Sequence, residues 1–338
     1  MRNLMFNLTL ALLLAGVYVI LGGCTDKSDD QTDPFTFEPT KDQFKSGALN
    51  VGSIVNIDSV RNAILLGARQ VNEAGGILGK ELNLLALKAR DTEHAVSLAQ
   101  EMFEYDIKLV NVSYSSRSKA VAALAIPKGI PIISESATST FFTDFNDDDL
   151  YFRMVPSDVY QAQLLALLAR EAGHETAITV HNDTDQYGET LISLFSSEFE
   201  ELGGRVLEQV AVPFSVTQGF ATYIQPILQL SPDVVLNVVL EADESANFVN
   251  EALQAGVSSR FLFPDASAGI PAFANNLVDA EAIADDLGTA PCFGLVTNPQ
   301  MMFFDQAYRQ TFDTAPSTFD VNGYDFVMIA AWRSNMRV

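Results

Sequence analysis

The chain has 338 residues, of which 48% are hydrophobic, and a formal net charge of −23 at pH 7. This apolar content is sufficient for two packed cores of ordinary size. The strong negative charge repels nucleic acids and anionic lipid surfaces, so DNA binding and RNA binding are excluded as functions.

The first 23 residues are typical of a bacterial export signal. Arg2 supplies a positive charge near the N-terminus, and the apolar run at 8–21 is too short to span a bilayer comfortably. Residues 21–24 read Leu-Gly-Gly-Cys and resemble the bacterial lipobox, in which the cysteine becomes the lipid-bearing first residue. We therefore predict that Cys24 is lipidated and that removal of Arg2 changes the net charge from −23 to −24. The alternative is a plain signal peptide followed by an incidental cysteine.

The segment at 24–46 predicts a flexible tether. It contains several Asp, Thr and Ser residues, two prolines and no sustained apolar period, so it cannot bury enough surface to fold alone. The globular part then begins near Ala48. If Cys24 carries lipid, Cys292 is the remaining cysteine and no intramolecular disulfide can form. We expect Cys292 to be a small buried residue, and a reactive thiol is the second reading.

From residue 48 the sequence alternates short apolar strands with amphipathic helices. In the first half we expect strands at 48–55, 82–87, 108–112 and 130–133, and helices at 60–74, 94–105 and 118–126. After Val155-Pro156 the rhythm restarts, with helices at 160–171, 190–202, 220–230 and 245–255, and strands at 176–180, 206–210, 234–239 and 261–263. Such alternation implies parallel sheets covered on both faces. The predicted fold class is therefore α/β, with two Rossmann-like doubly wound lobes and a ligand cleft between them.

Polar clusters directly follow several of the predicted strands. They are the runs 113–116, 134–139 and 181–183, together with Tyr187-Gly188 and Asp265. Doubly wound lobes bind ligands at the carboxyl ends of their strands, and hydroxyls that open helices can hold a carboxylate. An acid such as Asp265 can pair with an ammonium group. The clusters therefore suit a zwitterion, although each residue alone could equally be a helix cap or a turn residue.

Five motifs occur in a specific order. They are 72–80 (Asn-Glu-Ala-Gly-Gly-Ile-Leu-Gly-Lys), the helix start at 95–99, 131–134 with 137–139, 152–158 (Phe-Arg-Met-Val-Pro-Ser-Asp) and 185–188 (Asp-Gln-Tyr-Gly). Together they resemble the type I periplasmic substrate-binding proteins of the leucine/isoleucine/valine-binding group, over about residues 48 to 330. The resemblance implies two lobes joined by three crossover strands and a ligand clamped as the lobes close. It also implies an ATP-driven importer in the inner membrane as the partner.

The resemblance implies lobe boundaries as well. Lobe 1 would comprise 47–156 and 289–338, and lobe 2 would comprise 157–288. The hinge would lie near Val155-Pro156 and again near Gly288-Thr289.

Seven ligand contacts carry over from the family where the motifs match. They are Ser115, Ser116, Ala137, Thr138, Tyr187, Asp265 and Glu241. The first four resemble the groups that hold the ligand's α-carboxylate. Tyr187 matches an aromatic contact on the second lobe, and Asp265 matches an acid that takes the α-amino group. Glu241, with Leu240 before it, is the loosest match.

Three features depart from the family pattern. The loop at 56–59 is short where the family has a longer one, so one wall of the pocket is expected to be missing. Tyr114 places bulk near the cleft. The chain stops at Val338, soon after residues 323–326 open what should be a long helix, and we interpret this end as a fragment or a frameshift.

No pattern of residues indicates an enzyme, a cofactor or a metal site. His94, His174 and His181 lie on different predicted elements and lack a neighbour at metal-ligand spacing. Gly75-Gly76 joins a helix to a strand and is not a phosphate-binding loop. The acidic runs at 147–149 and 285–286 lack calcium-loop spacing and are expected to be solvated turns.

Two functional hypotheses from different classes remain. The first is a transport component that binds a small amino acid or a related carboxylate. The second is an interaction or sensor module of the same fold, such as an activator of peptidoglycan synthases. The combination of Thr138, Tyr187 and Asp265 favours the first, whereas the short loop and Tyr114 favour the second.

Overall fold

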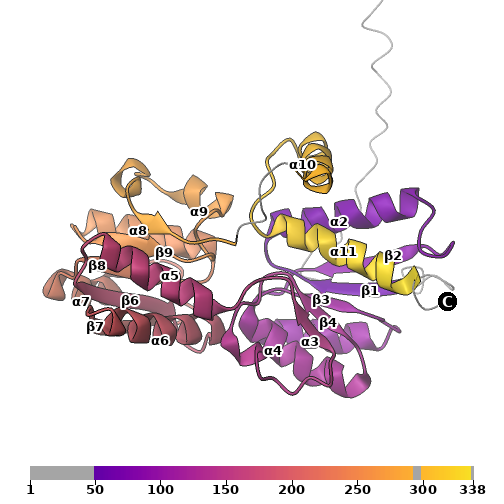
Figure 1. Cartoon of the computed structure of the whole chain (residues 1–338), viewed down its shortest axis with the longest axis horizontal. Coiled ribbons are helices and arrows are strands. Elements are labelled where there is room, and N and C mark those ends of the chain that lie inside the picture. The colour runs from indigo at the N-terminus through magenta and orange to yellow at the C-terminus, as the bar shows by residue number, and fades with distance from the viewer. Residues whose placement is uncertain (1–48, 292–297, 336–338) are drawn as a thin grey trace, which may run out of the picture.

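The computed structural model describes residues 49–291 and 298–335, which form two α/β lobes side by side (Figure 1). Each lobe is built on a five-stranded parallel sheet. The predicted class, two Rossmann-like doubly wound lobes, is confirmed. The predictions for the export signal, Cys24, the tether at 24–46 and Cys292 lie outside the described residues.

The sheet of lobe 1 has the strand order β2-β1-β3-β4-β5. Its strands are β1 (Leu49–Ile54), β2 (Leu82–Leu87), β3 (Val110–Val112), β4 (Ile132–Ser134) and β5 (Tyr151–Arg153). Strand β1 lies between β2 and β3 inside the sheet and is buried along nearly its whole length, which explains why it carries no charged residue. Strand β5 was not predicted, because it lies at the edge of the sheet and only Tyr151 of its three residues is buried, so it shows no apolar run.

Helices cover both faces of this sheet. One face carries α2 (Asp58–Glu73) and α11 (Asp320–Asn335), and the other carries α3 (Thr92–Phe103) and α4 (Ser115–Ala125). Helix α10 (Pro299–Phe312) packs through Phe304 and Tyr308 on the outer side of α2 and α11 (Figure 1). A short 3-10 turn, η1 (Ile126–Lys128), follows α4, and a second one, η2 (Thr140–Phe142), follows β4.

Two glycines allow α2 and α11 to approach closely. A Cβ atom on Gly323 would lie 2.8 Å from Val60 Cγ1 and 3.1 Å from the Val60 carbonyl oxygen. A Cβ atom on Gly67 would lie 3.2 Å from Val327 Cβ. Since larger residues would force the helices apart, these positions fix how α11 sits on lobe 1.

The sheet of lobe 2 has the strand order β10-β9-β8-β6-β7. Its strands are β6 (Thr176–Asn182), β7 (Arg205–Val212), β8 (Val234–Val238), β9 (Arg260–Phe263) and β10 (Leu287–Gly288). Helices α5 (Asp158–Glu171) and α6 (Gln186–Glu201) cover one face, and α7 (Ala221–Leu230) and α8 (Ala242–Gln254) cover the other. The short elements α9 (Pro271–Asn276) and η3 (Glu281–Ile283) precede β10.

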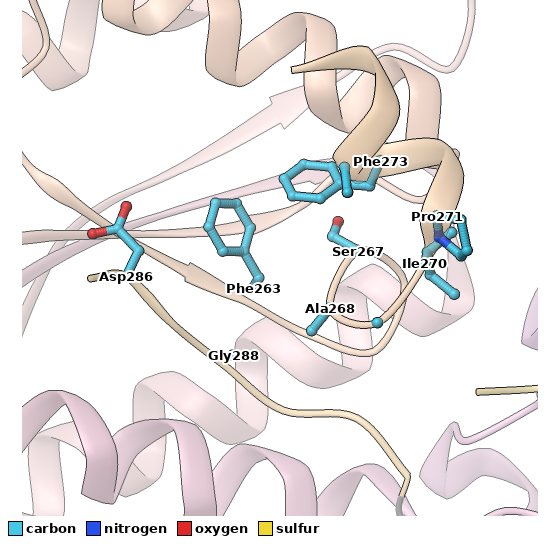
Figure 2. Close-up of a pocket in the computed structure, with 10 residues that line it drawn as sticks. Phe263, Ser267, Ala268, Ile270, Pro271, Phe273, Asp286 and Gly288 are labelled. Atoms are coloured by element: carbon cyan, nitrogen blue, oxygen red, sulfur yellow. The ribbon is translucent and has the colours of Figure 1, made fainter. Parts of the chain in front are cut away.

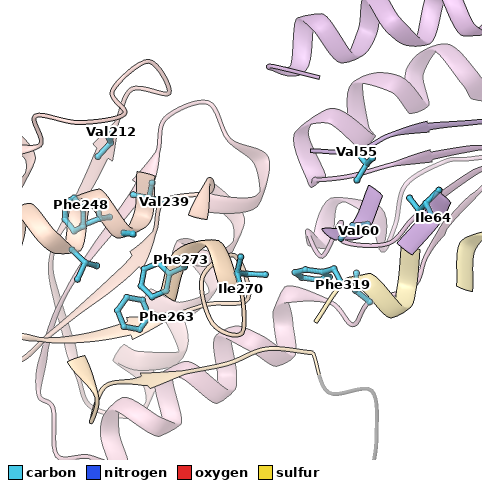
Figure 3. Packing of buried hydrophobic residues seen from close by; sticks show 14 of the residues in the cluster. Val55, Val60, Ile64, Val212, Val239, Phe248, Phe263, Ile270, Phe273 and Phe319 are labelled. Atoms are coloured by element: carbon cyan, nitrogen blue, oxygen red, sulfur yellow. The ribbon is translucent and has the colours of Figure 1, made fainter. Parts of the chain in front are cut away.

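The two lobes share an apolar contact as well as the chain crossings. Phe319, just before α11, is buried and points toward Ile270 of lobe 2, with Val60 of lobe 1 beside it (Figure 3). Within the described residues the chain passes from β5 to α5 at residues 154–157 and leaves lobe 2 after β10. The hinge and the lobe boundaries stay predictions.

Candidate functional site

Two hollows lie between the carboxyl ends of the two sheets. The inner cavity has a volume of about 20 Å³ and is lined by Tyr114, Ser115, Ser136, Tyr187, Leu240, Asp265, Ala266 and Phe319. The outer cleft has a volume of about 710 Å³ and shares Tyr114, Leu240, Ala266 and Phe319 with it. Since a water molecule requires about 10–15 Å³, the inner cavity has room for about one.

Lobe 1 presents hydroxyl groups to the inner cavity. Ser115 opens α4, is buried, and accepts a hydrogen bond of 3.2 Å from the backbone N–H of Ser139. Thr138 is also buried, and its Oγ1 has no hydrogen-bond partner among the described residues. Of these two predicted contacts, Ser115 therefore lines the inner cavity, whereas Thr138 lines neither hollow.

Lobe 2 presents a hydrogen-bonded pair. The Tyr187 hydroxyl donates to Asp265 Oδ1 over 2.6 Å, and both side chains line the inner cavity. Burial raises the pKa of Asp265, while the Tyr187 hydrogen bond acts in the opposite direction. Burial also raises the pKa of Tyr187 well above its usual value, so the phenol stays protonated and donates. The two predicted contacts on this lobe thus form one unit.

Asp158 is a residue of this region that the sequence reasoning missed. It opens α5, its exposed fraction is 0%, and neither carboxylate oxygen has a hydrogen-bond partner among the described residues. Burial raises the pKa of Asp158 well above its usual value, and the negative charge of Asp265 raises it further, while the Thr138 hydroxyl and the Arg153 charge act in the opposite direction. The backbone N–H of Asp158 donates to the Thr138 carbonyl oxygen over 2.9 Å, which places this acid beside the hydroxyl of lobe 1.

Ser116 and Ala137 occupy different environments from those expected. Ser116 Oγ donates to Asp185 Oδ1 over 2.7 Å and accepts from the Gln186 backbone N–H over 2.8 Å, so it joins α4 to α6. The backbone N–H of Ala137 donates to Ser134 Oγ over 3.0 Å. Neither residue lines the inner cavity or the outer cleft.

Glu241 is paired across the lobes at the edge of the outer cleft. Its carboxylate accepts from Arg117 Nη2 over 3.2 Å and from the Tyr114 hydroxyl over 3.3 Å. The Arg117 guanidinium also lies 4.7 Å from the centroid of the Tyr114 ring. The backbone of Tyr114 has φ 65, a left-handed conformation that is uncommon for an aromatic residue. The bulk of Tyr114 therefore stands where the inner cavity meets the outer cleft, as expected.

Comparison with known proteins settles the family. The sequence profile of the periplasmic binding protein family matches residues 53–331. This chain belongs to that family. It is a binding protein rather than an enzyme, and membership implies an extracytoplasmic, periplasmic location.

One curated relative and two solved structures illustrate the likeness. The leucine-, isoleucine-, valine-, threonine- and alanine-binding protein of Pseudomonas aeruginosa is 26% identical over 212 residues, which are 62% of this chain and 56% of that protein. The leucine-binding protein LivK of Thermotoga maritima has a TM-score of 0.74 at 21% identity, covering 84% of this chain and 82% of that one. A Rhodopseudomonas palustris solute-binding protein in complex with benzoate has a TM-score of 0.73 at 18% identity, covering 86% and 82%.

The short loop of this periplasmic binding protein does not leave a wall missing. All four residues from Asn56 to Ser59 line the outer cleft, where Asp58 pairs with Lys88 at 2.6 Å. Helix α2 begins at Asp58, so the loop is short because the helix starts early and its first turn forms the wall.

A further hollow of about 340 Å³ lies beside β10 and is lined mainly by apolar residues, including Phe263, Ile270 and Phe273 (Figure 2). None of the seven predicted contacts lines it. Asp286 at its margin is not a solvated turn residue, because its side chain is 2% exposed and accepts from the Phe261 backbone N–H over 3.1 Å. Apart from Ser267 and Asp286, this hollow is lined by apolar residues and glycines, so it offers few groups that could hold a charged ligand.

The described residues offer neither a metal site nor a membrane span. In that part of the chain, no group of three or more His, Cys, Asp or Glu residues is placed to hold a metal ion. Across the same residues, no helix has the length and apolar character needed to cross a membrane.

Proposed function

We propose that this periplasmic binding protein binds a small molecule carrying an α-ammonium and an α-carboxylate group, and holds it between the two lobes. The observation that carries the proposal is the buried acid Asp265, which lines the inner cavity, together with the fully buried acid Asp158, whose pKa the charge of Asp265 raises. A buried carboxylate without a partner is costly, and a cation that pairs with it removes that cost. A ligand ammonium between the two acids would supply the partner that Asp158 lacks.

The lobe 1 side of the cavity suits a carboxylate. Ser115 and Ser136 line the cavity, and Ser115 lies at the N-terminus of α4, where unsatisfied backbone N–H groups favour an anion. The ligand's carboxylate would therefore face lobe 1 and its ammonium would face Asp158 and Asp265. Such a ligand contacts both lobes at once and stabilises their closed arrangement.

Aromatic acids and fatty acids fit this arrangement less well. They carry a carboxylate but no ammonium, so Asp158 and Asp265 would remain buried without a cation. The Pseudomonas aeruginosa relative is named for five amino acids, whereas one solved structure of this fold holds benzoate. The two buried acids favour the amino-acid class for the chain described here.

The cellular role follows from the family. We propose that the protein delivers its ligand to an inner-membrane ABC permease, and that Cys24 carries a lipid anchor. An interaction or sensor module is the second candidate. It is favoured by the small inner cavity of about 20 Å³, which requires the lobes to separate before any amino acid can enter.

Isothermal titration of the purified protein with single L-amino acids and with benzoate tests the proposal. We expect an amino acid to bind, and Asp158→Asn and Asp265→Asn to weaken its binding by about 2–5 kcal/mol because each removes a charge partner of the ammonium. Asp148→Asn, in an exposed turn that lines neither hollow, is the matched control and should have almost no effect. Binding of benzoate without binding of any amino acid would contradict the proposal.

A further inference from the structure

The outer cleft has an excess of acidic side chains. It is lined by the acids Asp58, Glu241, Asp243 and Glu244 and by the cations Lys88 and Arg90. Two acids are neutralised by ion pairs, since Asp58 pairs with Lys88 and Glu241 pairs with Arg117. Asp243 and Glu244 remain on the wall of lobe 2, and exposed Arg90 stands on the wall of lobe 1.

Glu244 differs from the other acids of the cleft. Its Oε2 is buried and has no hydrogen-bond partner among the described residues. Burial raises the pKa of Glu244 to about 7, and the negative charges of Glu241 and Asp243 contribute to the rise. Asp243, in contrast, is exposed and accepts a hydrogen bond of 2.8 Å from Asn276 Nδ2. Glu244 therefore lines a ligand cleft while its buried oxygen lacks a partner.

The size of the two hollows determines where a ligand side chain must go. The inner cavity of about 20 Å³ lies among the groups that would hold the ammonium and the carboxylate. A side chain of any length must then pass Tyr114 into the outer cleft of about 710 Å³. There it meets Glu244 on the wall formed by the first turn of α8.

We propose that the ligand is a cationic amino acid, such as arginine or lysine, and that Glu244 in the outer cleft determines this preference by pairing with the side-chain cation. The inference rests on the amino-acid binding proposed above. An aliphatic side chain would leave the buried oxygen of Glu244 without a partner, which is unfavourable. An acidic side chain would face Glu244 and Asp243, and water screens the exposed Arg90 that could attract it.

The charge of the whole chain acts in the same direction. A net charge of −23 attracts cations by long-range electrostatics and repels anions. This effect raises the rate of association for a cationic ligand.

Isothermal titration of the full-length protein, purified in mild detergent, tests the inference with matched ligands. L-arginine and L-citrulline have nearly the same shape but differ in charge, and L-leucine and L-glutamate represent the aliphatic and acidic classes. We expect L-arginine to bind at least about tenfold more tightly than L-citrulline, as a charge-assisted contact requires. Glu244→Gln should reduce the affinity for L-arginine by about tenfold or more and leave L-citrulline within about twofold.

Glu200→Gln, on the exposed face of α6, is the matched control for the substitution, and thermal melting verifies that each variant is folded. Equal affinities for L-arginine and L-citrulline, or unchanged L-arginine binding in Glu244→Gln, would overturn the inference. Tight binding of L-leucine without L-arginine would overturn it too, while the proposed amino-acid function would stand. Absence of binding by all four amino acids would overturn both.

Discussion

The ion pair between Arg117 and Glu241 predicts that the lobes stay closed without help from a ligand. Arg117 belongs to lobe 1 and its side chain is 3% exposed, whereas Glu241 belongs to lobe 2 and its side chain is 28% exposed. The pair exists only while the lobes are together, so it stabilises the closed arrangement selectively. A hydrogen bond to a charged group contributes about 1.5–3 kcal/mol, which corresponds to a shift of about 10- to 150-fold in the closed-to-open ratio.

Removing this pair should therefore open the protein. Glu241→Gln should increase the radius of gyration measured by small-angle X-ray scattering in the absence of ligand, and Arg117→Gln should act in the same direction. Because both variants break one contact, the double variant should open the lobes no further than the single variants do. Glu200→Gln should leave the radius unchanged. An unaltered radius in both single variants would refute the role of this pair in closure.

Three further predictions concern pH, packing and location. Burial raises the pKa of Asp158, so its ionised form is disfavoured in the folded protein. Because the ammonium pairs with the ionised form, amino-acid affinity should fall as the pH decreases through this raised pKa. Asp158→Asn removes the buried charge, so it should increase the melting temperature at neutral pH while weakening binding. Titration at pH values from about 8 to about 5 checks the affinity, and rising affinity in acid would contradict the reasoning. Gly323→Ala places a Cβ atom 2.8 Å from Val60 Cγ1 and should destabilise the fold by about 1–3 kcal/mol in urea melts, so an unchanged midpoint would argue against tight packing of α11 on α2. Cys24→Ala should release the protein from the membrane fraction or leave it unprocessed, and a soluble unmutated protein would exclude the anchor.

The sequence predicted the fold well because buried parallel strands are short, mainly apolar runs. Strand β2 was predicted with its exact bounds, and β1 within one residue at each end. Helix starts were less accurate. Helices α4 and α6 begin at Ser115 and Gln186, earlier than the expected 118 and 190, because their first turns are polar and show no apolar period.

Individual site residues were predictable only where a strand end places them. Tyr187 and Asp265 follow β6 and β9, and the sheet brings them together. Asp158 was missed because Ser157-Asp158 before an apolar helix looks like an ordinary helix start. Glu241 was predicted as a ligand contact, but its pairing with Arg117 joins residues 124 positions apart, which a single sequence without aligned homologues does not reveal.

Native mass spectrometry of the protein purified from its own cells tests the central claim most directly. If an amino acid binds between Asp158 and Asp265, the spectrum should show a bound species with the mass of an amino acid. This species should be lost from the Asp158→Asn and Asp265→Asn variants but retained by Asp148→Asn. A bound aromatic or fatty acid, or an amino acid retained by both cavity variants, would contradict the account.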